Sequence, residues 1–187
     1  MKKIAVLVSG GGTNLQALID SGIDINLVVS SKKDAYALTR ATENGIKTAI
    51  VDWSEYNRDR ERFSGDILAI LAAHNIELVV NAGFMVILSD CVCKAFPNAM
   101  INVHPSLIPA FCGEGFYGIK VHKAALERGV KVSGATVHFV TEVCDGGPII
   151  MQKSVEVYED DTPEKLQARV MAVEREILPE AVKLLNK

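Results

Sequence analysis

The feature that most constrains the fold is an alternation of short β-branched apolar runs with longer amphipathic stretches. The apolar runs are typical of strands buried on both faces, and the stretches between them have the apolar spacing of helices. We expect strands at Ile4–Val8, Ile25–Val29, Thr48–Val51, Leu78–Val80 and Met100–Val103. We expect helices at Asn14–Asp20, Ala35–Asn44, Arg58–His74 and Gly118–Arg128. This order predicts an α/β fold, a doubly wound and mostly parallel sheet with helices on both faces.

The pattern changes after Gly129, where two strand-like runs follow each other, Val132–Val140 and Ile149–Val157. The segment between them is rich in turn residues, so we expect an antiparallel addition to the sheet near the C-terminus. No linker or repeat divides the chain, and 187 residues with 49% hydrophobic content can fill one core. We therefore expect a single domain over residues 1–187.

A final helix is predicted by Thr162 and Pro163, since a capping hydroxyl and a proline at the first helical position start helices. Its apolar stripe is expected at Leu166, Val170, Val173, Ile177 and Leu178. Pro179 removes one backbone donor and crowds the preceding turn. It is expected to kink this helix or to end its regular part.

The charge balance disfavours nucleic acid as a partner, because 20 Lys and Arg against 23 Asp and Glu leave a net charge of −3. The apolar start breaks at Ser9, too soon for a signal peptide, and no stretch reaches transmembrane length. We expect a cytoplasmic protein with no membrane partner.

Paired CxxC spacing is absent, so we expect reduced thiols and no metal site; the cysteines are Cys91, Cys93, Cys112 and Cys144.

A glycine-rich loop, Ser9–Asn14, joins the first strand to the first helix. Backbone N–H groups at such a helix start can bind an anion. A dinucleotide fingerprint needs a glycine where Leu15 stands, and a Walker loop needs a following Lys-Ser or Lys-Thr, so neither fits. Two interpretations remain open: a tight turn that needs glycine for its backbone angles, or a site for a phosphomonoester.

Two polar residues, Asn102 and His104, stand at the end of the strand predicted at Met100–Val103. Ligands of open α/β sheets collect at the carboxyl ends of strands, and i, i+2 spacing puts both side chains on one face. An amide can bind a developing oxyanion, and an imidazole can move a proton near neutral pH, so the pair suits acyl transfer. The alternative is a hydrogen-bonded histidine of the core or rim.

Three further polar residues strengthen the catalytic interpretation. Asp145, in a glycine-rich turn, could orient His104 and stabilise its charged form, although Asp-Gly is also a plain turn signal. His138 lies in the preceding strand, where it could simply occupy one face. Glu174 borders the apolar stripe of the last helix and is expected to point partly inward, unless it forms a salt bridge at the helix edge.

With these residues, the chain resembles the phosphoribosylglycinamide formyltransferase family over essentially its whole length. The resemblance rests on four segments: Ser9–Gln16, Ala82–Met85, Asn102–Pro109, and Val137–Val140 followed by Asp145–Pro148. It implies the formyltransferase fold, with Asn102, His104 and Asp145 as the catalytic residues. It further implies that the acceptor substrate is bound by Gly12, Thr13, Asn14, His138 and Glu174. The residues implied to contact the folate are Arg60, Met85, Val86, Ile87, Leu88 and Thr141.

The activity implied by the resemblance is transfer of the formyl group of 10-formyltetrahydrofolate to the primary amine of glycinamide ribonucleotide, in de novo purine biosynthesis. No metal is required, and the protein is expected to be a monomer or homodimer. Two positions depart from the family pattern. Val86 stands where many members have Arg or Lys, and Cys112 replaces a more usual proline in a glycine-bearing loop.

Three alternative functions are weighed. A formyltetrahydrofolate hydrolase usually carries an extra N-terminal domain, whereas here the first strand begins at Ile4. A methionyl-tRNA formyltransferase adds a C-terminal RNA-binding domain, which we do not expect here. A non-catalytic phosphate sensor has no need for Asn102, His104 and Asp145 together. Formyl transfer to a phosphorylated amine is therefore favoured.

Overall fold

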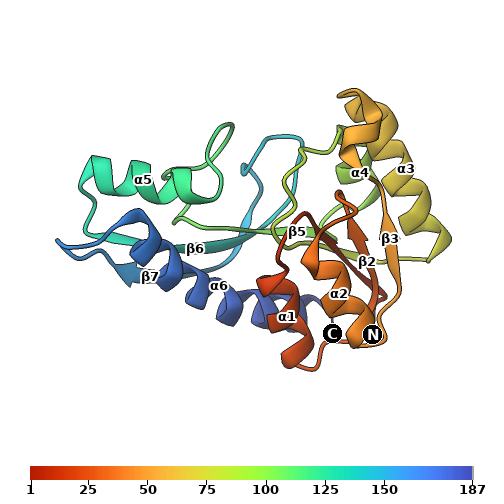
Figure 1. Ribbon diagram of the computed structural model, residues 1–187, viewed down its shortest axis with the longest axis horizontal. Helices are drawn as coiled ribbons and strands as arrows, with labels where there is room; N and C mark the ends of the chain where they lie inside the picture. The colour runs from red at the N-terminus through yellow and green to blue at the C-terminus, as the bar shows by residue number, and fades with distance from the viewer. Residues whose placement is uncertain (187) are drawn as a thin grey trace.

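The computed structural model describes residues 1–186 and contains one seven-stranded sheet (Figure 1). The strands are β1 (Ile4–Val8), β2 (Ile25–Ser30), β3 (Thr48–Ile50), β4 (Leu78–Asn81), β5 (Met100–His104), β6 (Val132–Phe139) and β7 (Ile149–Glu156). Their order across the sheet is β3-β2-β1-β4-β5-β6-β7. The strands from β1 to β5 pair in parallel, whereas β6 and β7 are antiparallel additions. The predicted fold class is confirmed.

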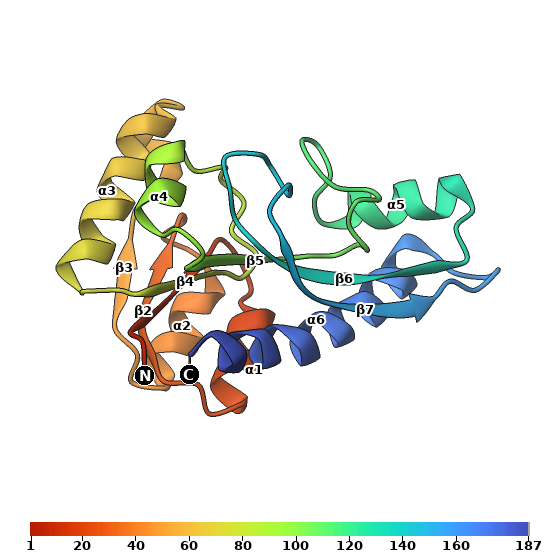
Figure 2. The ribbon, with the colours of Figure 1, turned by 180° about the vertical axis from the view of Figure 1, so that it is seen from behind.

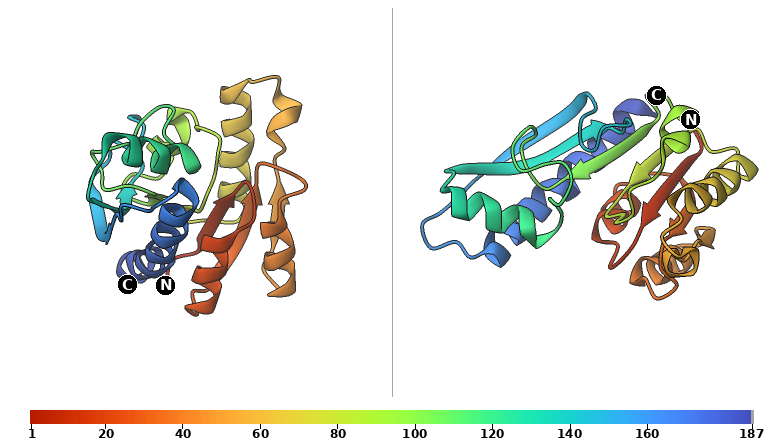
Figure 3. Two further views of the ribbon diagram at one scale, coloured as in Figure 1. Left: turned by 60° about the vertical axis from the view of Figure 1, so that its left-hand side comes forward. Right: turned by 90° about the horizontal axis from the view of Figure 1, so that it is seen from above.

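The helices cover both faces of the sheet (Figure 3). They are α1 (Thr13–Asp20), α2 (Tyr36–Glu43), α3 (Arg60–Ala73), α4 (Asp90–Ala95), α5 (Ile119–Arg128) and α6 (Pro163–Leu185), with a short 3₁₀ helix η1 (Trp53–Tyr56). Helices α1, α2, α5 and α6 contribute to the core on one face, and α3 and α4 to the core on the other. Helix α6 runs back along β6 and β7, and the two chain ends lie side by side, where the Lys2 N–H donates to Asn186 Oδ1 at 2.7 Å (Figure 2).

Strand β1 shows why the apolar runs form buried strands. All five of its residues are buried, with Ile4, Val6 and Val8 in one core and Ala5 and Leu7 in the other. Because successive side chains of a strand point to opposite faces, a strand with helices above and below must be apolar throughout. The continuous apolar runs in the sequence therefore report the central position of these strands.

Three features differ from the sequence expectations. Helix α3 begins two residues later than expected, because Asn57 and Arg58 have left-handed backbone angles and Asp59 caps the helix by accepting from the Arg62 N–H at 3.0 Å. Helix α4 was not expected at all. The expectation that Pro179 would end the regular part of the last helix is wrong, since α6 continues to Leu185.

The continuation of α6 past Pro179 has a packing reason. Leu178, Ala181 and Val182, on both sides of the proline, are completely buried in the core that α6 shares with the sheet. Burying these side chains offsets the one backbone hydrogen bond that proline cannot make. Among residues 1–186, no helix is both long and apolar enough to span a bilayer.

Candidate active site

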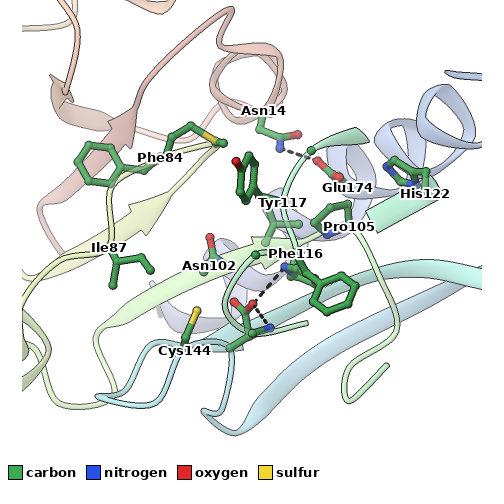
Figure 4. A pocket seen from close by; sticks show the side chains of 18 of the residues that line it. Asn14, Phe84, Ile87, Asn102, Pro105, Phe116, Tyr117, His122, Cys144 and Glu174 are labelled. Atoms are coloured by element: carbon green, nitrogen blue, oxygen red, sulfur yellow. Dashed lines mark hydrogen bonds and ion pairs between the residues drawn. The ribbon is translucent and has the colours of Figure 1, made fainter. Parts of the chain in front are cut away.

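A cavity of about 610 Å³ opens where β1, β4 and β5 end (Figure 4). Strands β1 and β4 are neighbours at the point where the strand order reverses, and ligands of doubly wound sheets bind at such a switch point. Segments after these strands line the cavity, together with one face of α6 and the loop before α5. The predicted site residues that line it are Thr13, Asn14, Met85, Val86, Ile87, Asn102, His104, Asp145 and Glu174.

His104 is buried at the end of β5, with a hydrogen-bond acceptor facing each ring nitrogen. Its Nε2 lies 2.9 Å from the carbonyl oxygen of Phe111, and its Nδ1 lies 3.5 Å from Asp145 Oδ2. A carbonyl and a carboxylate only accept hydrogen bonds, so both nitrogens are satisfied only when each carries a proton. The contacts therefore place an acceptor for a proton at each ring nitrogen.

Asp145 connects the two loops that flank the cavity. Its Oδ2 accepts a hydrogen bond from the Gly113 N–H at 2.9 Å, and its Oδ1 lies 3.5 Å from His138 Nε2. Burial alone would raise the pKa of the Asp145 carboxyl, but the contacts with His138, Gly113 and His104 outweigh it and lower the pKa. The group is therefore a carboxylate at neutral pH and can hold a positive charge on His104.

Asn102 and His138 face each other across the β5–β6 pairing. The ring Nδ1 of His138 lies 2.9 Å from the Phe139 carbonyl oxygen and so carries a proton. A proton on Nε2 would be donated toward Asp145 Oδ1, at 3.5 Å. In the neutral ring, Nε2 instead accepts a hydrogen bond from Asn102 Nδ2, at 3.2 Å. This contact turns the NH₂ group of Asn102 toward His138 and leaves its second hydrogen free. His138 lies outside the cavity lining, so the structure places it behind Asn102 and Asp145 rather than against a substrate.

The glycine loop meets the cavity at Thr13 and Asn14. The carbonyl groups of Gly10 and Gly11 accept hydrogen bonds from the Ala37 N–H and from Arg40 Nε, so they are turned toward α2. This arrangement suits an anion at the start of α1, and Arg40 adds positive charge beside the loop.

Gly12 has a packing role that the sequence did not predict. Its φ is +72°, and an added Cβ would lie 2.7 Å from the Cβ of Ala37. Gly11 has open space around the same position. Glycine is therefore required at position 12 by the left-handed backbone of the turn and by the closeness of α2, whether or not a ligand binds.

We expect Gly12→Ala to destabilise the protein. The strained backbone costs about 1–3 kcal/mol, and the forced contact with Ala37 costs roughly 1–3 kcal/mol more. Thermal unfolding of Gly12→Ala, compared with Gly11→Ala, measures the effect. Equal unfolding temperatures for the two variants would contradict the packing role.

Glu174 and Asn14 form a buried polar pair between α6 and α1. Asn14 Nδ2 donates to Glu174 Oε2 at 2.8 Å, and only 8% of the glutamate is exposed. The Nδ2 group of Asn14 is therefore directed to Glu174. Burial raises the pKa of Glu174 more than the hydrogen bond from Asn14 lowers it. The inward orientation expected for Glu174 is present.

We expect Glu174→Gln to change how stability depends on pH. An acid whose pKa is raised in the folded state contributes stability at low pH, and this stability is lost as pH rises through the folded pKa. The glutamine keeps an acceptor for Asn14 but cannot ionise. The variant should therefore match the wild type below about pH 4.3, the ordinary value of a glutamate, and exceed it increasingly as pH rises.

Thermal unfolding between pH 4 and pH 8 checks this prediction. Glu180→Gln is the matched control, because Glu180 lies exposed on the same helix. Parallel curves for the wild type and Glu174→Gln would show that ionisation of Glu174 costs the folded protein nothing.

A family model described as formyl transferase matches residues 2–182 of the chain. The chain belongs to the formyl transferase family. It is 38% identical over 187 residues to the chloroplastic phosphoribosylglycinamide formyltransferase of Arabidopsis thaliana, covering 97% of this chain and 64% of that protein. It is 42% identical over 189 residues to the trifunctional purine biosynthetic protein adenosine-3 of Gallus gallus, covering 98% of this chain and 18% of that protein. The chain thus spans less than two thirds of the length of these relatives.

A solved structure agrees with this assignment. The crystal structure of glycinamide ribonucleotide transformylase 1 from Symbiobacterium toebii matches this chain with a TM-score of 0.91 and 42% identity. The match covers 99% of this chain and 87% of that one. Sheet order and antiparallel additions are therefore shared features of the family.

The segment expected to contact the folate divides between two hollows of the structure. Met85, Val86 and Ile87 line the main cavity and also a second hollow of about 490 Å³, which contains Arg60. Leu88 lies outside both linings and packs against the core below, so it supports the segment from beneath. Thr141 is likewise outside both linings, and its hydroxyl donates to the Val143 carbonyl at 3.3 Å.

Several residues that line the main cavity were not predicted from the sequence. Gln167 and Met171 share a face of α6 with Glu174, and their i, i+4, i+7 spacing could have found them once Glu174 was selected. Phe116 and Tyr117 enter from the loop before α5, and His122 enters from α5 itself. No periodic signal marks this irregular loop.

Cys144 also lines the cavity, beside Asp145. Burial, and next the charge of Asp145, raise the pKa of its thiol, which keeps it protonated and a poor nucleophile. All four cysteines are free thiols. Among residues 1–186, no group of three or more His, Cys, Asp or Glu side chains is arranged to hold a metal ion.

Proposed function

We propose that this protein transfers the formyl group of 10-formyltetrahydrofolate to the primary amine of glycinamide ribonucleotide, a step of de novo purine biosynthesis. The observation that carries the proposal is that one cavity joins the Asn102, His104 and Asp145 cluster to the start of α1. An acyl-transfer centre and an anion site within one cavity suit an acceptor that has an amine at one end and a phosphate at the other. The names of the relatives agree with this assignment.

The acceptor binds with its phosphate at the start of α1. The donors are backbone N–H groups of the loop at Gly12, Thr13 and Asn14, assisted by the Thr13 hydroxyl. Glu174 contributes farther along the same wall, because its Oε1 is not used by Asn14. The amine then reaches toward Asn102 and His104.

The folate binds along Met85, Val86 and Ile87, whose side chains form an apolar edge of the cavity. Arg60, in the adjoining hollow, suits a carboxylate at the far end of the folate. Leu88 and Thr141 act indirectly, by supporting the segments on either side. Val86 contributes an apolar contact where many family members have a cation.

The reaction begins with attack of the neutral acceptor amine on the formyl carbon. The new carbon–nitrogen bond converts the carbonyl oxygen into an oxyanion, which accepts a hydrogen bond from the second N–H of Asn102 Nδ2 and is stabilised by the positive charge of His104. The attacking nitrogen loses a proton, and the departing folate nitrogen gains one, through water ordered by Asp145. Cleavage of the bond between the formyl carbon and the folate nitrogen releases tetrahydrofolate and the acceptor, whose amine now carries the formyl group.

His104 acts mainly through its charge in this scheme. Both ring nitrogens already face acceptors, the Phe111 carbonyl and the Asp145 carboxylate. A direct hydrogen bond to the oxyanion therefore requires one of these contacts to open. His138 positions the amide of Asn102 and does not contact the acceptor.

The test is a reconstitution with purified substrates. The protein should release tetrahydrofolate from 10-formyltetrahydrofolate only when glycinamide ribonucleotide is present, with stoichiometric formylation of the acceptor. Release without acceptor indicates a hydrolase, and binding of both ligands without turnover indicates a sensor. Either result contradicts the proposed activity. A cytoplasmic location and a monomeric or homodimeric state, without nucleic-acid or membrane partners, stay predictions.

A further inference from the structure

His122 is a buried imidazole in the wall of the cavity to which the chemistry above gives no role. It lies in the first turns of α5, only 1% exposed, and lines the same cavity as Glu174 and Asn102. Its neighbours on the buried face of α5 are the apolar Val121 and Ala125. These apolar neighbours offer no hydrogen-bonding group that would account for a histidine at this position. Figure 4 shows the ring on the Glu174 side of the cavity.

One ring nitrogen of His122 has no hydrogen-bond partner among residues 1–186. This atom, Nδ1, is buried. A buried polar atom that loses its water without gaining a partner destabilises the folded protein. Burial, and next the charge of His104, lower the pKa of His122 to about 4, so the ring is neutral and offers one donor and one acceptor.

Asn14 presents a second unpartnered atom to the same cavity. Its Nδ2 must face the carboxylate of Glu174, which only accepts, so its Oδ1 points elsewhere. That oxygen is buried without a hydrogen bond in the described part of the chain. Asn14 and His122 both line the cavity, on either side of Glu174 (Figure 4). An unpartnered amide oxygen and an unpartnered neutral imidazole in one lining indicate a ligand with more than one hydrogen-bonding group on this side.

A vicinal diol fits these two groups better than the other parts of the acceptor. A phosphate presents only acceptors at neutral pH and cannot satisfy Asn14 Oδ1. A hydroxyl both donates and accepts, so one hydroxyl can donate to Asn14 Oδ1 and its neighbour can pair with the imidazole. In the proposed acceptor, the ribose lies between the phosphate at Thr13 and the amine at Asn102. We propose that His122 binds one hydroxyl of the acceptor ribose, an inference that rests on the proposed function.

The experiment measures the dissociation constant of glycinamide ribonucleotide by calorimetry, for the wild type, His122→Leu and His122→Gln. Leucine removes both ring nitrogens, and we expect it to weaken binding about 10-fold, the effect of one neutral hydrogen bond. Glutamine keeps a donor and an acceptor, so most of the affinity should return. The unliganded His122→Leu protein should unfold at a higher temperature than the wild type, because the orphaned nitrogen is gone.

Deoxy acceptors separate a hydroxyl contact from a general change of shape. The 2′-deoxy and 3′-deoxy acceptors each remove one hydroxyl. With one of them, His122→Leu should bind within about twofold of the wild type, because the contact is already lost. A 10-fold loss with both analogues, or an unchanged affinity for glycinamide ribonucleotide, would overturn the assignment. If His122→Leu does not fold, the same comparison is made with His122→Ala, which also removes both ring nitrogens and should likewise match the wild type with one of the two analogues.

Failure of the inference is distinguishable from failure of the proposed function. Calorimetry needs no turnover, so a wild-type protein that binds the acceptor without formylating it contradicts the proposed function alone. A wild type that formylates the acceptor, with an unchanged affinity in His122→Leu, contradicts the role of His122 alone. A folate analogue should bind the wild type and both variants equally, which checks that the rest of the cavity is intact.

Discussion

Replacing His104 by alanine is expected to lower kcat/KM for formyl transfer by about 10²–10⁴-fold, the usual contribution of a positioned charged or acid-base group. The imidazole lies between the Phe111 carbonyl and the Asp145 carboxylate, an arrangement that favours its charged form. Loss of the ring removes that charge from the place where the oxyanion develops. His104→Gln should be nearly as inactive, because an amide can donate a hydrogen bond but carries no charge.

Cys144→Ala is the matched control for the His104 variants. Cys144 lines the same cavity and lies next to Asp145, but its thiol is kept protonated. We expect this variant to retain activity within a few-fold. The assignment fails if His104→Ala loses only a few-fold while its acceptor affinity and unfolding temperature stay normal, or if Cys144→Ala is as inactive as His104→Ala.

The strands and their grouping could be predicted because burial on both faces leaves a direct mark on the sequence. Helix α4, at Asp90–Ala95, left no such mark, since six residues are too few to show a helical period. The expectation that Pro179 would end the regular part of the last helix was wrong for a different reason. The local effect of the proline on the backbone is unfavourable, yet the buried side chains around it hold α6 together, and burial of this kind depends on tertiary packing.

The site residues were predictable where a strand end fixes their place. Asn102 and His104 follow from the parallel sheet alone, and Asp145 from the turn that returns toward it. The position of His138 was not predictable, because it depends on the β5–β6 register that pairs it with Asn102. Antiparallel register is set by the hydrophobic pattern and the turns together. The close approach of Gly12 to Ala37 was likewise not predictable. It depends on the distance between the glycine loop and α2, which no local sequence pattern indicates.

Asp145→Asn is expected to reduce kcat/KM by about 10²–10⁴-fold. Asparagine has nearly the same size and can still bond the Gly113 N–H through its oxygen. It loses the negative charge that faces the imidazoles of His104 and His138 at 3.5 Å each. Without this charge, the positive form of the His104 ring is no longer stabilised by a neighbouring carboxylate. The carboxylate that would order water for the proton transfer is also lost.

The stability of Asp145→Asn separates this electrostatic role from a purely structural one. The pKa of Asp145 is lowered in the folded protein, so ionisation of this group stabilises the fold above the ordinary value of an aspartate, about 3.9, and the benefit is lost as pH falls through the lowered pKa. Thermal unfolding should therefore show the variant less stable than the wild type at neutral pH, with a difference that shrinks as pH falls below 4. If Asp145 only shaped its turn, asparagine would serve equally well, because Asn adopts the left-handed backbone found here as readily as Asp. An Asp145→Asn protein with wild-type kcat/KM and a parallel stability curve would therefore remove Asp145 from the catalytic scheme.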